Sequence, residues 1–245
     1  MNEMMFYDLR ESAGLAPSLS TQIAREIGRR VVAGHYAPGA LVEDEGALAE
    51  RYQVSRSVIR DAVKILVGKG LLEVRRGIGT KVRERVAWGL LDDDVLAWHQ
   101  SAPPKPAFLR QLTDFRRVIE PKAARWAAER GTEEGHQLIR DAQARMEAEK
   151  GSMEDFVIAD ALFHRAILRA ADNEFIRAME GVIYSALLGS IRLTNRDPRE
   201  NAASIPFHRD VADAILARDG DAAEKNMELL LADTRQRLGG KLNDD

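Results

Sequence analysis

Residues 44–70 hold two helical patterns with almost no chain between them, a combination that fits few folds. The stretch DEGALAERY predicts a first helix that Asp44 caps, and the dipeptide QV then leaves room for only a tight turn. Ser55 can cap a second helix, RSVIRDAVKILVGKG, whose apolar residues recur at helical spacing until Gly70. The inward-facing positions expected in this second helix are Val58, Ala62, Ile65 and Leu66.

The segments on either side of this pair complete a familiar unit. Ahead of it, LSTQIAREIGRRVVAG carries a helical apolar stripe that Gly34 ends, and HYAPGALV contains a Pro-Gly turn. Behind it, LLEVRRGIGTKVRE alternates on both sides of a glycine-containing turn, which predicts a β-hairpin. Two short helices joined by a tight turn and followed by a hairpin predict a winged helix-turn-helix.

The charge of this unit suits binding to DNA. The whole chain has a formal net charge of −3, but nine Lys and Arg residues and only two acids lie between Arg51 and Arg83. The start of the second helix of such a motif enters the major groove, where arginines reach guanine or phosphate and hydroxyls reach phosphate. The alternative is a helical pair with solvated arginines. The expected DNA contacts are Ser55, Arg56, Ser57 and Arg60 on the helix and Arg75, Arg76 and Lys81 on the hairpin.

The run YAPGALVEDEGALAERYQVSRSVIRDAVKILVGKGLLEVRRGIGTKV resembles the DNA-binding domain of GntR-type bacterial transcription regulators. One departure is Gly46, which stands where many relatives carry an arginine, so the resemblance does not imply a phosphate contact there, although it still implies the fold. The resemblance implies that the DNA-contacting positions are held by Ser55, Arg56, Ser57, Arg60, Arg76 and Gly77.

Beyond residue 104 the sequence shows long helical stripes and no strand-like alternation. These stripes predict an all-α helical bundle over 105–240. Between the two parts, VAWGLLDDDVLAWHQSAPPKP has three consecutive aspartates, two exposed-looking tryptophans and three prolines, which predicts a linker over 84–104. The expected protein is therefore mainly α, with a winged helix-turn-helix and an N-terminal extension over 1–83, the linker, and the bundle.

The helical part resembles the FCD ligand-binding domain of the FadR-type branch of the GntR family. The resemblance rests on FRRVIEPKAARWAAER, on the D-x-x-x-H pattern and on ADNEF. Within that branch, LLDDDVLAW followed by VIEPKAARWAAER is similar to repressors of sugar-acid operons of the D-galactonate type. The resemblance implies an effector-binding and dimerisation domain, a homodimer, and a small carboxylate metabolite as the effector.

Asp160 and His164 lie four residues apart on a helix face that also carries Phe163, so both are expected in a core. His208 lies on an apolar stripe of its own, and the three side chains together suit Zn, Mn or Ni. The alternative is a polar pair satisfied by hydrogen bonds. The resemblance adds that metal-binding FCD domains use a fourth ligand, a histidine, where this chain has Leu230, so the metal is either held by three ligands or lost.

An acidic effector calls for a cation near the same core. Arg116 in DFRRVIEP shares a helix face with apolar residues, and its planar fork could clamp a carboxylate. The alternative is a surface ion pair with Glu120, one turn further on. Late in a long helix, Arg192 and Asn195 could contact sugar hydroxyls or simply be solvated. The expected effector-binding residues are thus Arg116, Asp160, His164, Arg192, Asn195 and His208.

Composition limits the remaining possibilities. The chain has no cysteine, which excludes disulfides, thiolate metal ligands and a cysteine nucleophile. No apolar run approaches the roughly 20 residues of a membrane span, and the first residues lack the layout of a signal peptide. We therefore expect a cytoplasmic protein with no membrane partner.

Three functions are open on the sequence alone. The first is a DNA-binding transcriptional regulator, a repressor acting as a homodimer on operator DNA, whose affinity for the operator changes when the effector binds. The second is a metal-dependent hydrolase that uses Asp160, His164 and His208, which would leave the basic N-terminal unit unexplained. The third is a DNA-binding protein with no ligand. We expect the first, and we expect no enzymatic activity.

Overall fold

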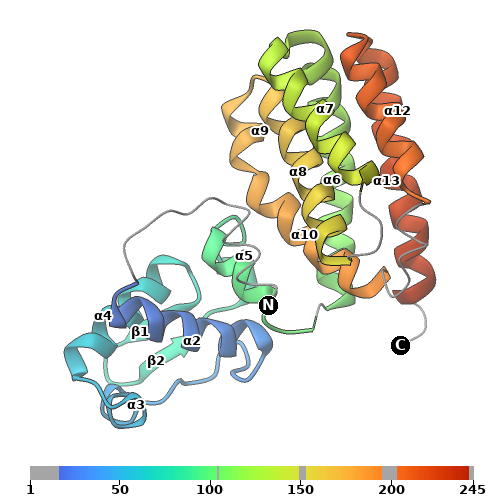
Figure 1. Cartoon of the computed structure of the whole chain (residues 1–245). Helices are drawn as coiled ribbons and strands as arrows, with labels where there is room; N and C mark the ends of the chain where they lie inside the picture. The colour runs from blue at the N-terminus through green and yellow to red at the C-terminus, as the bar shows by residue number, and fades with distance from the viewer. Residues whose placement is uncertain (1–16, 104, 149–152, 195–202, 243–245) are drawn as a thin grey trace. The chain divides into compact units, whose positions relative to one another are not determined.

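The computed structural model describes residues 17–103, 105–148, 153–194 and 203–242, which form two compact units divided after Pro103. Helices make up most of both units, and within the described residues the one sheet is a two-stranded hairpin (Figure 1). The mainly α fold class is therefore confirmed. Residues 1–16, where the predicted N-terminal extension begins, lie outside the described part of the chain.

The N-terminal unit has the predicted winged-helix order, and its helices begin at the predicted caps. Asp44 accepts hydrogen bonds from two backbone N–H groups of the following helix, and Ser55 accepts one from Val58. The hairpin is antiparallel, with Arg75 opposite Gly79. The elements are α2 (Leu19–Ala33), α3 (Glu45–Tyr52), α4 (Arg56–Gly68), β1 (Leu72–Arg75), β2 (Gly79–Val82), the 3₁₀ helix η1 (Arg85–Ala87) and α5 (Asp93–His99).

The inward face of α4 differs by one position from the predicted face. Ile59 and Val63 are buried together with the predicted Ala62 and Leu66, whereas the predicted Val58 and Ile65 are only partly buried. The run VIRDAVKILV has apolar residues at adjacent positions, so periodicity leaves the exact face open. The packing of α4 against α2 and β1 decides it.

The segment 84–104 was predicted as a linker with exposed tryptophans, but its residues 84–103 belong to the N-terminal unit. Both tryptophans are buried and belong to its hydrophobic core, so their predicted exposure is wrong. A Cβ on Gly28 of α2 would lie 2.3 Å from the Trp98 ring, so the missing side chain at Gly28 makes room for the indole. The Nζ of Lys69 lies 2.8 Å from Asp92, the residue that caps α5. The aspartates therefore begin a helix and bind a lysine.

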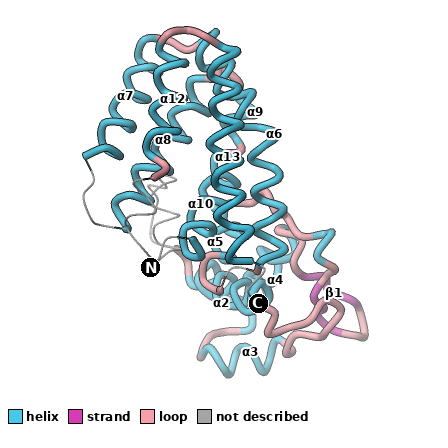
Figure 2. Tube along the Cα trace, turned by 90° about the vertical axis from the view of Figure 1, so that its right-hand side faces the viewer, coloured by secondary structure: helices cyan, strands magenta, loops and turns pink. Residues whose placement is uncertain are grey.

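The C-terminal unit is a bundle of helices that pack along one another (Figure 2). The long helices α6 and α13 lie side by side, α8 packs against α6 and α7, and α12 contacts α6, α7 and α13. This packing turns one face each of α6, α8 and α12 toward the interior. None of the described helices is both long and apolar enough for a membrane span. The elements are α6 (Pro106–Arg130), α7 (Glu133–Ala148), α8 (Met153–Ala170), α9 (Glu174–Ala178), α10 (Glu180–Thr194), α12 (Ile205–Leu216) and α13 (Gly220–Leu242).

Candidate functional sites

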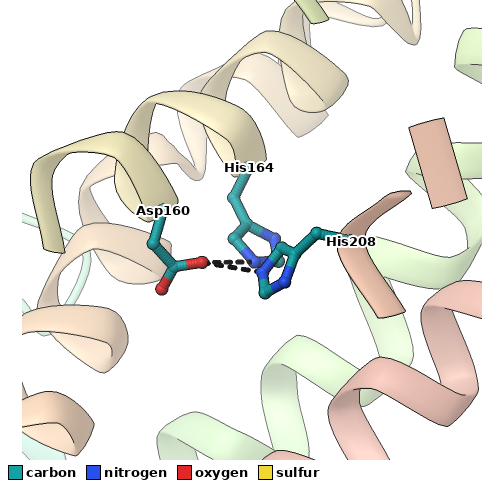
Figure 3. Close-up of side chains that lie close together, drawn as sticks. All are labelled: Asp160, His164 and His208. Carbon is teal, nitrogen blue, oxygen red and sulfur yellow. Dashed lines mark hydrogen bonds and ion pairs between the residues drawn. The ribbon is translucent and has the colours of Figure 1, made fainter. Parts of the chain in front are cut away.

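The structure brings Asp160 and His164 of α8 together with His208 of α12 inside the bundle (Figure 3). All three side chains are buried, and one ligand atom of each lies within 4.8 Å of the others. The Oδ1 atom of Asp160 lies 2.9 Å from Nε2 of His208 and 3.4 Å from Nε2 of His164. One carboxylate oxygen therefore faces two imidazole nitrogens from different helices.

Arg116 and Glu120 of α6 extend this group from the other side. Nε of Arg116 donates to Glu120, and Nη2 lies 3.3 Å from Nε2 of His164. Nδ1 of His164 forms an ion pair with the Glu120 carboxylate. Arg116 and Glu120 are 2% and 1% exposed, so the alternative of a solvated surface pair is wrong. We call these five residues, Arg116, Glu120, Asp160, His164 and His208, the polar cluster.

Opposite charges compensate for burial within the polar cluster. Burial by itself raises the pKa of Glu120, but the positive charges of Arg116 and His164 outweigh it and hold that pKa well below its usual value. Burial likewise raises the pKa of Asp160, and hydrogen bonds from His164 and His208 lower it by more. Burial lowers the pKa of His164, but the Glu120 carboxylate raises it above the ordinary range. The charged forms therefore stabilise one another.

The donor atoms fit a divalent metal in a specific way. Nδ1 of His208 lies 2.8 Å from the backbone carbonyl of Ser204, which can only accept, so Nδ1 carries a proton. Nε2 of His208 lies 2.9 Å from Asp160, where it either donates a hydrogen bond to the carboxylate or, without its proton, presents a lone pair that could bind a metal cation. Glu120 holds the second nitrogen of His164 in the same manner. Metal-binding histidines normally have such partners on their outer nitrogen.

The other positions predicted for this site do not contribute a described side chain to the polar cluster. Leu230 is buried on α13 and offers no ligand atom at the fourth metal position that the resemblance implied. Arg192 lies near the end of α10, and Asn195 lies outside the described residues. Sequence reasoning missed Glu120 as a member of the cluster, because the i, i+4 spacing of an Arg-Glu pair is the same on a buried and on an exposed face.

The residues predicted to contact DNA lie at the start of α4 and on the hairpin. Ser55, Arg56, Ser57 and Arg60 are exposed, and the hydroxyl oxygens of the two serines lie 2.8 Å apart. On the hairpin, Arg75, Arg76 and Gly77 are exposed and Lys81 is half-buried. Gly77 has a φ of 77°, a backbone conformation that favours glycine in the turn. Arg75 contacts Glu73 at 3.0 Å, so an acid on the same strand partly balances its charge.

A winged helix with an exposed basic helix start, followed by a helical domain with a buried polar cluster, defines a DNA-binding regulator with a ligand-binding domain. Residues 19–82 match the gntR family of bacterial regulatory proteins, and residues 111–233 match the FCD domain. The chain belongs to the GntR family, in the group that carries an FCD domain. It is a transcription regulator, and the relatives described below are also named as transcriptional regulators.

Two relatives match along most of their length. The galactonate operon transcriptional repressor of Escherichia coli (strain K12) is 32% identical over 219 residues, which cover 89% of this chain and 95% of that protein. The transcriptional regulator LutR of Bacillus subtilis (strain 168) is 29% identical over 219 residues, which cover 84% of this chain and 95% of LutR. A solved structure of Lar from Listeria monocytogenes matches with a TM-score of 0.64 at 15% identity, covering 93% of this chain and 99% of that one, and shows the shared fold.

Proposed function

We propose that this protein is a repressor that releases its operator when a small sugar acid binds in the helical unit. The polar cluster is the single observation that supports this most directly. It buries two cations, Arg116 and His164, among carboxylates that could accept hydrogen bonds from sugar hydroxyls. The similarity to a galactonate operon repressor makes galactonate the first acid to test.

The chemistry of the polar cluster suits a carboxylate carrying hydroxyl groups. The guanidinium and the imidazolium can donate to the acid group, and Asp160 can accept from a hydroxyl. Because Glu120 already balances Arg116, the effector would be held by directed hydrogen bonds rather than by one free cation. A divalent metal on Asp160, His164 and His208 would supply a further positive charge for the same carboxylate.

We assign the two units different roles. The winged helix over 1–83 would bind DNA, the segment over 84–104 would connect the units, and the bundle over 105–240 would bind the effector and form a homodimer. A dimer would present two winged helices to the two half-sites of a pseudo-palindromic operator. A regulator of this kind acts where the chromosome is, in the cytoplasm.

The effector is tested by its effect on DNA binding. Duplexes that bind the full-length protein are first selected from a randomised library, and their affinity is then measured by gel shift. We expect millimolar D-galactonate or a related aldonate to weaken binding by about 10-fold, within the usual range of coupling between sites. D-Galactose, which lacks the carboxylate, is the matched control and should change nothing. If no aldonate, uronate or dicarboxylate changes the affinity, the effector part of the proposal is wrong.

The DNA interface is tested by two alanine variants measured on the same duplexes. Arg56→Ala should weaken binding to the selected duplex by about 10-fold or more, and to a scrambled duplex by much less, if Arg56 contacts a base. Lys81→Ala should weaken binding to both equally and reduce the slope of log affinity against log salt by about 1, as a phosphate contact does. Equal effects of both variants on both duplexes would contradict these roles.

A further inference from the structure

The first turn of α3 carries an acid that contacts an arginine of α4. Glu45 is the first residue of α3, and Arg60 lies one turn into α4. Nε of Arg60 lies 3.1 Å from Oε2 of Glu45 and 3.3 Å from Oε1, and Nη2 lies 3.1 Å from Oε2. Two nitrogens on one edge of the guanidinium therefore face a single carboxylate.

Stability of the fold does not explain this contact. The side chain of Arg60 is 58% exposed and that of Glu45 is 39% exposed, and surface ion pairs of this kind stabilise a protein little. Buried residues such as Leu48 and Ile59 already join α3 to α4. A carboxylate on a surface that meets phosphates also weakens binding to any DNA. Glu45 therefore imposes an electrostatic cost on DNA binding in general, and a gain in recognition would offset it.

The neighbouring residues explain why Glu45 faces Arg60 and not Arg56. The Asp44 carboxylate accepts hydrogen bonds from backbone N–H groups at the start of α3, at 2.8 and 2.9 Å. These bonds and the nearby charge of Arg56 lower the pKa of Asp44. A Cβ on Gly46 would lie 3.3 Å from Nη2 of Arg56, so this guanidinium rests against the bare backbone of Gly46. Glu45 is then the acid that contacts Arg60, and the two arginines occupy separate places.

We propose that Glu45 is a positioning residue for Arg60 in operator recognition. Arginine reads guanine with two donors at once, which requires a fixed orientation of the guanidinium plane. A carboxylate on the Nε and Nη2 edge fixes that plane and directs the Nη1 and Nη2 end away from the protein. Ordering the side chain before DNA binds reduces the conformational entropy lost on binding. Glu45 thereby favours guanine at the base pair that Arg60 faces. This inference rests on the proposed DNA interface.

The test measures the ratio of affinities for selected and scrambled duplexes, with the full-length protein at fixed salt. Glu45→Gln should lower this ratio by about 10-fold, while affinity for the scrambled duplex stays equal or rises. Glu50→Gln removes the same charge from an exposed position of the same helix and is the matched control. It should leave the ratio unchanged within about 2-fold. Thermal unfolding should confirm that both variants remain folded.

A double-mutant cycle separates positioning from a direct effect of charge. If Glu45 acts through Arg60, then adding Glu45→Gln to the Arg60→Ala variant should not lower the ratio of the two affinities further. The inference is overturned if Glu45→Gln changes the ratio no more than Glu50→Gln, or lowers it equally in the Arg60→Ala background. If Arg60→Ala alone leaves the ratio unchanged, the proposed interface at Arg60 fails, and the positioning role fails with it.

Discussion

Glu120→Gln is expected to lower the free energy of unfolding by about 3–5 kcal/mol, because it leaves a buried arginine without its carboxylate. Arg116 lies at 2% exposure between Glu120 and His164, and water cannot replace the lost charge there. Glutamine keeps the size of the side chain, so a cavity contributes little. Urea denaturation at pH 7, followed by circular dichroism, measures the change.

The same helix supplies the control. Arg125 and Glu129 have the same spacing as the buried pair and form a hydrogen bond of 2.8 Å, but Glu129 is 40% exposed. Glu129→Gln should cost less than about 1 kcal/mol, because solvent screens an exposed pair. If both variants lost the same free energy of unfolding, burial would not strengthen the contribution of the Arg116–Glu120 pair to stability.

The loss caused by Glu120→Gln should also depend on pH in a defined direction. The folded-state pKa of Glu120 is depressed, so its contribution is fully present above the pKa of the unfolded chain, about 4.3. That contribution disappears as the pH falls from about 5 toward the depressed folded-state value. The difference between wild type and variant should therefore shrink in acid. A difference that grows in acid would contradict the ion-pair assignment.

Asp160→Asn is expected to weaken binding of a divalent metal by about 100-fold or more, because it removes the one charged ligand of the set. Calorimetric titration of the metal-free protein with Zn²⁺, Mn²⁺ and Ni²⁺ measures this directly. Binding should release protons, because a metal ligand must be deprotonated and the raised pKa of His164 favours its protonated form before a metal arrives. Titration in two buffers of different ionisation enthalpy detects the release.

Asp213→Asn is the matched control for the metal site. Asp213 is exposed on α12, the helix that carries His208, and its replacement should leave metal affinity unchanged. If the wild-type protein binds none of the three metals, the metal site is wrong and protons alone balance the polar cluster. If Asp160→Asn binds as tightly as wild type, the metal lies elsewhere.

Much of the N-terminal unit could be predicted because its signals are local. Asp44 and Ser55 bond to backbone groups two or three residues away, and Gly77 permits a turn through its own φ angle. Such interactions form between chain neighbours, so residue type and spacing determine them. The winged-helix order and the helical nature of the described residues beyond 104 follow from the same kind of information.

The predictions from the sequence that were wrong or left open concerned packing between distant segments of the chain. Trp98 is buried because Gly28, 70 positions earlier, leaves room for its ring. The inward face of α4 was set by α2 and β1, and the burial of Glu120 by the helices around α6. In each case the local sequence permits two faces or two degrees of exposure, and only the neighbouring elements distinguish them.

The sequence by itself determined the order of the elements, their caps and the residue types that could bind a metal or DNA. The tertiary structure alone decided that Asp160 meets His208 across 48 residues, and that Glu120 completes the polar cluster. The physical reason is the range of the interactions. Caps and turns are hydrogen bonds within a few residues, whereas a buried ion pair requires the surrounding helices to exclude water before it forms.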